Sequence, residues 1–222
     1  MQISVIIPTL NEENQIAKTL GSVGRGVEVI VVDGGSVDNT ASIAEKFGAR
    51  VIKSEKGRGV QQDIGAANAK GDVLLFLHAD TILPSGWRDF IAVALSGSNV
   101  IGGAFLLGID SSKPLLKFII KAANIRAKYL GLIYGDQAIF ARREGFFRAG
   151  GFKGLPIMED VDFIRRLKKQ GKVKLIMEKV LTSERRWDKK GVLQNTLDNW
   201  FLLLMYYLGY SPERIYRLYY KR

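Results

Sequence analysis

Short apolar segments alternate with helical segments over the first 77 residues, and this alternation restricts the fold more than any other feature. The apolar segments ISVIIPTL, VEVIVVD, ARVIKS and DVLLFL have the length of strands. VEVIVVD is apolar almost throughout, as strands are when helices cover both faces of a sheet. Because strand–helix–strand crossovers are right-handed, the order predicts an α/β fold with a doubly wound, largely parallel sheet and helices on both faces.

The pattern is less regular after residue 96. NVIGGAFLLGI and VKLIM are predicted strands, PLLKFIIKAANIRAKYLG (114–131) and EDVDFIRRLKKQG are predicted helices, and YGDQAIFARR is a strand or a loop. The last thirty residues are predicted to be helical and are rich in aromatic side chains. No repeat or linker interrupts the chain, so we expect one domain over 1–222, with a nucleotide-binding half (1–96), an acceptor half (97–190) and a helical C-terminal tail (191–222).

Composition narrows the partners and the compartment. Lys and Arg number 33 against 22 Asp and Glu, a net charge of +11 that favours an anionic partner: a nucleotide, a phospholipid surface or a nucleic acid. The absence of cysteine excludes disulfides and cysteine zinc sites. With no signal-peptide pattern and no apolar run of about 18 residues, we expect a cytoplasmic location.

Carboxylates follow the predicted strands. Glu12, Asp33 and Asp80 come after the first, second and fourth strands, and the carboxyl ends of parallel strands meet at one ligand-binding edge. Because grouped carboxylates repel, they favour a bound cation or hydroxyl donors. Asp80 suits Mn²⁺ or Mg²⁺, which often take one or two protein carboxylates plus phosphate oxygens. An alternative is that a strand-end Asp caps the next helix; Asn11 is a predicted cap of this kind, with Glu12 and Glu13 in the first turn.

His78 is the only histidine in the chain and precedes Asp80 by two residues. Residues two apart in an extended segment point the same way, so both side chains are expected at one strand end. His78 is therefore either a structural residue or a contact for a nucleotide or for the metal site.

Four segments, VIIPTLNEE, VVDGGSVDNT, LFLHADT and MEDVDFIRRL, occur in this order. Together they resemble a family 2 glycosyltransferase of the nucleotide-diphospho-sugar transferase (GT-A) fold, over roughly residues 1–190. The chain is most similar to the small bacterial members, and the later TSERRW resembles the arginine–tryptophan motif of processive relatives. The resemblance implies a hexosyltransferase-type enzyme that takes its sugar from a nucleotide-diphospho-sugar, with a UDP-sugar favoured.

The resemblance also implies roles for particular residues. His78-Ala79-Asp80 stands where the family has an Asp-x-Asp motif, so Asp80 would bind Mn²⁺ or Mg²⁺ on the diphosphate and His78 would face the ribose. Some members use a late histidine as a further metal ligand, which this chain lacks. The expected nucleotide pocket contains Pro8, Thr9, Asn11, Glu12, Asp33 (at the base), Arg58, His78, Asp80, Arg186 and Trp187.

The resemblance further implies that Asp160, in MEDVDF, is the catalytic base, with Glu159 as its neighbour or as an acceptor contact. Alternatively, both acids stabilise the start of a helix by its dipole. Asp162 is expected to face outward or to pair with Arg165 or Arg166. A base separate from the leaving group favours single displacement with inversion. The segments GGAF and YGDQAIF are expected to form sugar and acceptor walls, where Asp136 and Gln137 grip hydroxyls or belong to a turn.

Two other functions are open to such a chain: a nucleotidyltransferase acting on a sugar phosphate, or a non-catalytic nucleic-acid-binding protein. PTLNEE is acidic where the first of these usually has a basic, glycine-rich phosphate loop. Acidic strand ends would repel a phosphate backbone, and strands lack interleaved aromatics, so we expect no nucleic-acid partner.

Basic and apolar residues alternate in KPLLKFIIKAANIRAKYLGLIYG, and WFLLLMYYLGY is followed by RIYRLYYKR. Each helix could simply face the core. Together they are typical of helices that lie on an anionic bilayer. They predict peripheral contact with the inner face of a membrane and a lipid or lipid-linked acceptor.

Overall fold

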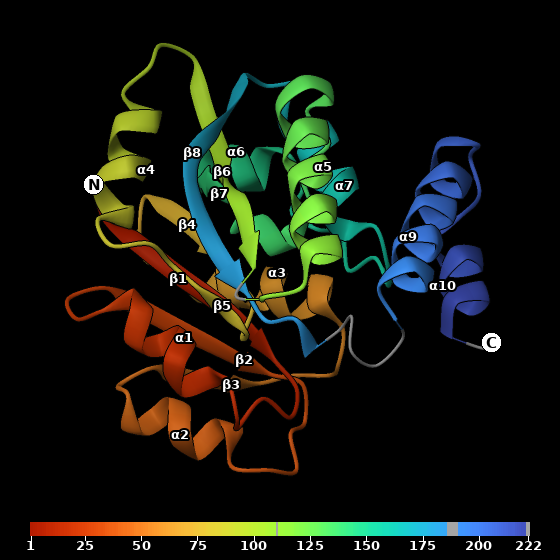
Figure 1. Cartoon of the computed structure of the whole chain (residues 1–222). Coiled ribbons are helices and arrows are strands. Elements are labelled where there is room, and N and C mark those ends of the chain that lie inside the picture. The colour runs from red at the N-terminus through yellow and green to blue at the C-terminus, as the bar shows by residue number, and fades with distance from the viewer. Residues whose placement is uncertain (110, 186–190, 221–222) are drawn as a thin grey trace.

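The computed structural model describes residues 1–109, 111–185 and 191–220 (Figure 1). The strands are β1 (Ile3–Thr9), β2 (Glu28–Asp33), β3 (Arg50–Lys53), β4 (Val73–Phe76), β5 (Thr81–Ile82), β6 (Val100–Ile109), β7 (Phe140–Arg142) and β8 (Lys172–Thr182). The helices are α1 (Ile16–Val23), α2 (Thr40–Lys46), α3 (Arg58–Asn68), α4 (Trp87–Leu95), α5 (Pro114–Leu130), α6 (Arg143–Arg148), α7 (Glu159–Leu167), α9 (Val192–Tyr207) and α10 (Pro212–Tyr220), with a 3₁₀ turn η1 (Gly135–Gln137).

The strands form one sheet in the order β3-β2-β1-β4-β7-β6-β8-β5. β3, β2, β1 and β4 are parallel neighbours, and β6 is parallel to β8. β7 is antiparallel to both β4 and β6, and β5 is antiparallel to β8. The predicted α/β fold with a largely parallel sheet is confirmed, with two reversed strands added. Because β7 is reversed, its beginning lies at the edge where β1 and β4 end.

Helices cover both faces of the sheet, as predicted. Alternate residues of β4 point to opposite faces. Leu75 packs with apolar residues of α1, α2 and α4, whereas Phe76 packs with residues of α3, α6 and α7. On the second face, Phe76 forms aromatic contacts with Phe146, Phe152 and Phe163, with ring centroids 4.8–6.4 Å apart. This buried core holds the strand ends of the site in place.

Gly102 and Gly103 of β6 line no cavity described below; they allow close packing of strands. A Cβ at Gly103 would lie 2.3 Å from the Lys174 carbonyl oxygen and 2.5 Å from the Phe140 ring. The prediction that these glycines form a wall for a sugar is therefore wrong, because neighbouring strands already fill the space beside them.

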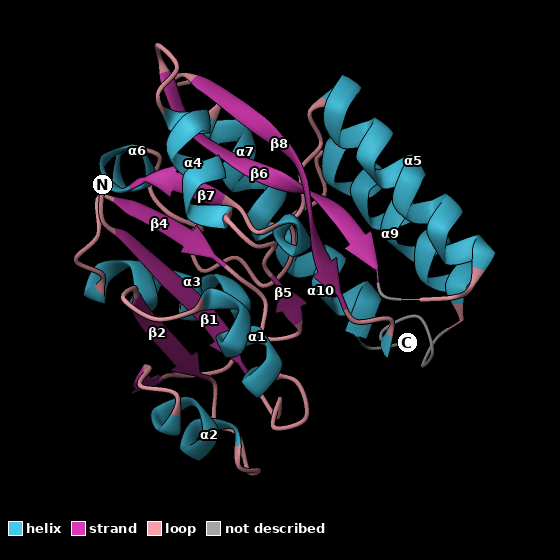
Figure 2. Cartoon of the chain, turned by 60° about the vertical axis from the view of Figure 1, so that its left-hand side comes forward, coloured by secondary structure: helices cyan, strands magenta, loops and turns pink. Residues whose placement is uncertain are grey.

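The C-terminal helices lie beside α5, away from the centre of the sheet (Figures 1 and 2). Leu202 and Met205 of α9 and Ile215 of α10 pack around Ile157, which precedes α7. The predicted helical tail is confirmed, and it reaches the loop that leads to Asp160. Within the described ranges, none of the helices combines the length and the apolar character needed to cross a membrane. The division of the chain into a nucleotide half and an acceptor half stays a prediction.

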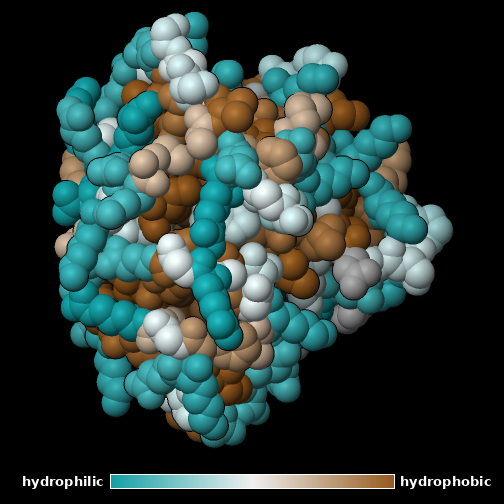
Figure 3. Space-filling view, turned by 90° about the vertical axis from the view of Figure 1, so that its left-hand side faces the viewer, coloured by the Kyte–Doolittle hydropathy of each residue, from teal (hydrophilic) through white to brown (hydrophobic). Residues whose placement is uncertain are grey.

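The face that lies on the left in Figure 1 is largely covered by hydrophilic side chains, with apolar ones visible between them (Figure 3). Such a mixture is typical of an ordinary solvent-facing surface.

Candidate active site

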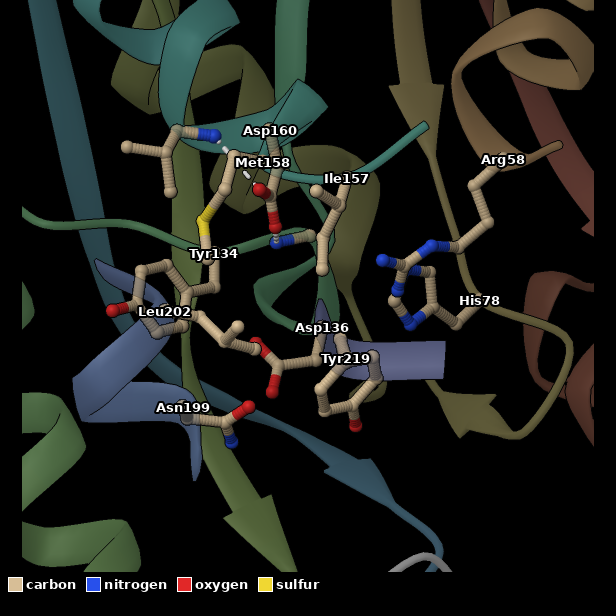
Figure 4. Close-up of a pocket in the computed structure, with 12 residues that line it drawn as sticks. Arg58, His78, Tyr134, Asp136, Ile157, Met158, Asp160, Asn199, Leu202 and Tyr219 are labelled. Carbon is tan, nitrogen blue, oxygen red and sulfur yellow. Dashed lines mark hydrogen bonds between the residues drawn. The ribbon is translucent and has the colours of Figure 1, made fainter. Parts of the chain in front are cut away.

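Two adjoining cavities lie at the edge of the sheet where β1 and β4 end. The larger, here called the Asp80 cavity, has a volume of about 390 Å³ and is lined by Leu10, Asn11, Glu12, Arg58, His78, Ala79, Asp80, Asp136, Thr182, Ser183 and Arg185. The smaller, the Asp160 cavity (Figure 4), has a volume of about 100 Å³ and is lined by Arg58, His78, Tyr134, Gly135, Asp136, Ile157, Met158, Asp160, Val161, Asn199, Leu202 and Tyr219. Arg58, His78 and Asp136 line both cavities and form their common wall.

Two of the strand-end carboxylates meet in the Asp80 cavity around one arginine. Nη2 of Arg185 lies 2.8 and 2.6 Å from the two carboxylate oxygens of Glu12 and 3.9 Å from Oδ2 of Asp80. Burial raises the pKa of Glu12, and the charge of Asp80 adds to this effect, while Arg185 opposes it. The guanidinium of Arg185 thus offsets part of the repulsion between these two carboxylates, which the sequence predicted to need a cation or a hydrogen-bond donor.

The carboxylates also fit a divalent cation by the chemistry of their oxygens. Among the described residues, no group of three or more His, Cys, Asp or Glu side chains could hold a metal ion. A Mn²⁺ or Mg²⁺ ion held by one or two carboxylates and by substrate phosphates needs no such group. Asp80 and Glu12 therefore fit this kind of site.

Asp33 takes part in a turn instead of lining either cavity. Its carboxylate accepts hydrogen bonds from the backbone N–H groups of Gly35 and Ser36, at 3.3 and 3.0 Å, and from the Thr9 hydroxyl at 3.2 Å. It is buried, as are Pro8 and Thr9, which also lie outside both sets of lining residues. Contact of these three residues with a nucleotide stays a prediction.

Asn11 does not cap a helix, contrary to the prediction. It adopts a left-handed conformation with φ of 55°, and α1 begins only at Ile16. Its side-chain oxygen accepts from the Val37 N–H at 2.9 Å, and its own N–H donates to Ser36 Oγ at 2.8 Å. Asparagine tolerates this backbone region better than most residues. The result is a bridge between the loops after β1 and β2 that places Glu12 in the Asp80 cavity.

Arg58 and Glu159 form an ion pair behind the common wall. Nε of Arg58 lies 3.0 Å from Oε1 of Glu159, whose side chain is only 3% exposed. Glu159 lines neither cavity. Glu159 therefore orients the guanidinium of Arg58, and a contact of Glu159 with the acceptor stays a prediction.

Asp160 lies at the amino end of α7, two residues after Met158, which has a strained backbone. Met158 has φ of 62°, in the left-handed region that is unfavourable for such a side chain. Oδ2 of Asp160 accepts a hydrogen bond from the Gly135 N–H at 2.6 Å, and Oδ1 accepts one from the Val161 N–H at 2.7 Å (Figure 4). The residue before α7, Met158, makes no capping side-chain hydrogen bond, so Oδ1 of Asp160 satisfies one N–H group at the start of the helix. The carboxylate also crosses to η1 and faces the cavity.

Gly135 lies at the point where Asp160 and His78 approach each other. A Cβ built on Gly135 would be 3.1 Å from Nε2 of His78 and 3.2 Å from Oδ2 of Asp160. His78 is thus positioned by the end of β4 next to the carboxylate from α7. The segment after β4 therefore contributes to both cavities: Asp80 lines the larger one, and His78 lies in the wall that the two cavities share.

The Asp160 cavity includes Tyr134, from the segment YGDQAIF that is expected to form a wall, and three residues of the C-terminal helices that the sequence did not single out. Tyr134 stacks with Arg126, whose guanidinium carbon is 3.7 Å from the ring centroid. Burial raises the pKa of Tyr134 to about 12, and the nearby carboxylates of Asp160 and Asp136 add to the effect, so its hydroxyl keeps its proton. Asn199, Leu202 and Tyr219 close the cavity from α9 and α10 (Figure 4). Their aromatic and apolar character in the tail was visible, but their position depends on tertiary packing.

Asp162 joins α7 to α9. It pairs with Arg165 at 3.1 Å and with Arg166 at 2.7 Å, and it accepts a hydrogen bond from the Tyr206 hydroxyl at 3.0 Å. The predicted arginine pairing is present, whereas outward orientation is wrong because Asp162 is buried. Burial alone would raise the pKa of Asp162, but the hydrogen bonds and charge of its partners, led by Arg166, outweigh this and lower it. Arg186 and Trp187, two further predicted residues, lie outside the described residues.

The strand ends and the loops between them form the two adjoining cavities of an α/β protein, and comparison with known proteins places the chain in a family. Residues 4–149 match the family model described as "Glycosyl transferase family 2", and the chain belongs to this family. The matched range ends before α7 and Asp160. Membership favours the glycosyltransferase interpretation over the nucleotidyltransferase and nucleic-acid-binding alternatives.

Curated relatives match part of the chain. The uncharacterized glycosyltransferase Rv0539 of Mycobacterium tuberculosis is 31% identical over 85 residues, which are 38% of this chain and 39% of the relative. The 4,4'-diaponeurosporenoate glycosyltransferase of Staphylococcus haemolyticus is 38% identical over 92 residues, 36% of this chain and 24% of the relative. The matches thus span about two fifths or less of the length of these relatives.

Solved structures share the fold. Residues 1–349 of TarS of S. aureus superpose with a TM-score of 0.64 at 21% identity, covering 83% of this chain and 61% of that fragment. Glucosyl-3-phosphoglycerate synthase of Mycobacterium tuberculosis, in complex with Mn²⁺, UDP and phosphoglyceric acid, has a TM-score of 0.62 at 22% identity and covers 94% of this chain and 78% of the synthase chain. At this identity the likeness confirms the GT-A fold alone.

Proposed function

We infer that the chain is an inverting glycosyltransferase that moves a sugar from a nucleotide-diphospho-sugar to an acceptor hydroxyl. The observation that carries this proposal is the common wall: a cavity with Asp80 and Glu12 adjoins a cavity with Asp160, and Arg58, His78 and Asp136 line both. A reaction between a charged donor and a hydroxyl needs such a pair of compartments. Family membership supports the reaction class, and complexes of structural neighbours with UDP, UDP-GlcNAc or Mn²⁺ support a UDP-sugar donor.

The Asp80 cavity suits the diphosphate of the donor. Asp80, with Glu12, would hold Mn²⁺ or Mg²⁺, and the ion when bound would neutralise charge on the departing diphosphate. Arg185 and Arg58 add fixed positive charge at the same cavity. His78, between the two cavities, is placed to donate or accept a hydrogen bond with the donor's ribose or its phosphate–sugar linkage.

Asp160 is suited to act as the base. Its two backbone hydrogen bonds fix the carboxylate in the smaller cavity, away from the diphosphate. The acceptor oxygen would attack the anomeric carbon while Asp160 takes its proton. The bond between that carbon and the diphosphate oxygen then breaks, and a nucleoside diphosphate leaves. Attack from the side opposite the leaving group inverts the anomeric centre.

The test is turnover with a panel of nucleotide sugars, with and without Mn²⁺, followed by release of the nucleoside diphosphate. Asp160→Asn should remove transfer yet bind donor as the unmodified protein does, because the base contacts the acceptor. Asp80→Asn should lose the Mn²⁺-dependent part of donor binding, measured as thermal stabilisation by the nucleotide sugar.

Asp89→Asn, at an exposed carboxylate of α4 remote from the cavities, is the matched control and should behave as the unmodified protein. Release of pyrophosphate from a nucleoside triphosphate, without turnover of any nucleotide sugar, would contradict the proposal. Retained transfer in Asp160→Asn would remove Asp160 as the base.

A further inference from the structure

A third hollow lies between α5 and α9, which run side by side (Figure 2). Its volume is about 250 Å³. Phe118, Ile119 and Ala123 of α5 form one side, and Trp200 of α9 faces them. We call this hollow the α5–α9 groove.

The groove adjoins the Asp160 cavity. Tyr134, Asp136 and Asn199 line both. Arg126, which stacks on Tyr134, also lines the groove. Its polar side chains therefore gather mainly at the end next to Asp160, whereas its apolar side chains come from the faces of α5 and α9 that lead away from the site.

The outer end of the groove is exposed and apolar. Phe118 is 69% exposed and Trp200 is 56% exposed, and neighbouring Leu197 and Leu204 of α9 are also exposed. Large apolar side chains gathered on adjacent helices mark an interaction surface more often than scattered ones do. Lys117 and Lys121 of α5 are exposed on the same helix and supply positive charge.

This distribution matches an amphipathic molecule. A peptide strand in the groove would need partners for its backbone N–H and C=O groups, and the apolar walls provide few. A hydrocarbon chain needs none. Its polar head would lie among Tyr134, Asp136 and Asn199, next to the proposed base.

We propose that the acceptor is a membrane lipid whose hydrocarbon chain lies in the α5–α9 groove while its polar head enters the Asp160 cavity. This inference rests on the proposed function, because it names the acceptor of that same site. The exposed apolar residues of α5 and α9, together with the lysines of α5, then lie against an anionic bilayer from which the lipid is taken. Part of the chain's large positive charge thereby has a partner.

Binding of a chain can be measured without catalysis. Trp200 lines the groove, Trp87 at the start of α4 is buried, and Trp187 lies outside the described residues, so the part of the quenching by a brominated chain that Trp200→Phe removes reports contact with Trp200. A dibrominated long-chain alcohol, added below its micelle concentration without donor or metal, should quench the full chain saturably. Trp200→Phe should lose this component of the signal.

Two variants and one control locate the binding. Ala123→Phe fills the groove with a ring and should weaken saturable quenching about tenfold, about the cost of displacing a small part of a buried chain. Phe118→Gln, at a largely exposed side chain that folding does not require, should weaken it in the same direction. Leu115→Phe makes a similar change on α5 outside the groove and should bind as the unmodified protein does.

Absence of saturable quenching, or equal affinity in Ala123→Phe and Leu115→Phe, would overturn the proposal. Asp160→Asn should bind the alcohol normally. If Asp160→Asn loses transfer and neither the unmodified protein nor any variant shows quenching, the groove is rejected and the proposed reaction stands. If quenching is saturable but Asp160→Asn keeps transfer, the proposed reaction is rejected and the groove stands.

Co-sedimentation with vesicles tests the membrane as the source. Binding should require anionic phospholipid and fall as salt rises, and Lys117→Gln should weaken it about fivefold, the effect of removing one basic residue from such a surface. Lys46→Gln, on α2, should have no effect. Protein that stays in the supernatant with anionic vesicles at low salt would overturn the membrane lipid as acceptor.

Discussion

A methyl group added at Gly135 would test whether Asp160 and His78 act at one point. The new Cβ would lie 3.1 Å from Nε2 of His78 and 3.2 Å from Oδ2 of Asp160, closer than the 3.4 Å at which ordinary contact begins. One or both side chains must therefore move by a few tenths of an ångström. The 2.6 Å hydrogen bond from the Gly135 N–H to Asp160 holds the carboxylate against this movement.

The size of the effect follows from the sensitivity of a positioned base. A displacement of about 1 Å costs up to about 100-fold in rate, so a few tenths should lower kcat about three- to tenfold. Donor binding should change less than kcat, since Asp80, Glu12 and Arg185 of the Asp80 cavity stay in place and His78 is the residue of its wall that the methyl group approaches. Gly135 is not among the glycines with positive φ, so alanine adds no backbone strain, and the free energy of unfolding should stay within about 1 kcal/mol.

Steady-state kinetics and denaturant unfolding of Gly135→Ala measure the two quantities separately. Gly21→Ala is the matched control: Gly21 lies in α1, has no atom within 4 Å of its built Cβ, and lacks positive φ. It should gain about 0.5–1 kcal/mol of stability as alanine replaces glycine in a helix, with kcat unchanged. Unchanged kcat in Gly135→Ala would refute the reasoning, since the reacting groups would then not meet at Gly135.

Three other substitutions have outcomes set by the structure. Asp162→Asn should destabilise the protein by about 2 kcal/mol at pH 7, the value of hydrogen bonds to a charged group. The pKa of Asp162 is lowered in the folded protein, so this stabilisation is present above the ordinary pKa near 3.8 and disappears as the pH falls through the folded pKa. The denaturant unfolding curves of the two proteins should therefore converge in acid. Gly103→Ala should lower the free energy of unfolding by about 1–3 kcal/mol or more, because a Cβ would lie 2.3 Å from the Lys174 carbonyl oxygen, which is held in the sheet. A stability equal to that of the unmodified protein would show that β6 and β8 can separate locally. Arg185→Gln should tighten the binding of Mn²⁺, because the guanidinium no longer competes with the ion for Glu12 and Asp80. Calorimetry above pH 7 without nucleotide measures this affinity. An unchanged affinity would mean that Arg185 and the ion use different oxygens.

The first half of the sheet was predictable because its order follows from local patterns. A helix follows each of β1, β2 and β3, and right-handed crossovers leave few alternatives for the order of β1 to β4. β7 was not predictable as a strand between β4 and β6, because it has three residues and its pairing depends on partners far along the chain. β8 is longer than predicted because its second part, Glu178–Thr182, has no continuous apolar run and is a strand through its pairing with β6 and β5.

The candidate site was predictable where it depends on strand ends. Glu12, His78 and Asp80 follow β1 and β4 directly, and the structure brings them to one cavity. The Arg58–Glu159 pair joins residues about a hundred positions apart and has no local signature. Asn11 was predicted wrongly because a cap and a left-handed bridge favour the same residue type.

The common wall of Arg58, His78 and Asp136 has a thermodynamic consequence for any two molecules that occupy the cavities together. A molecule in one cavity contacts side chains that also face the other, so the two binding equilibria share a coupling free energy. That free energy is reciprocal: the factor by which one molecule changes the dissociation constant of the second is the factor by which the second changes that of the first. Titrating each in the presence of the other therefore measures a single quantity twice, and the pair of cavities behaves as one binding unit with two compartments.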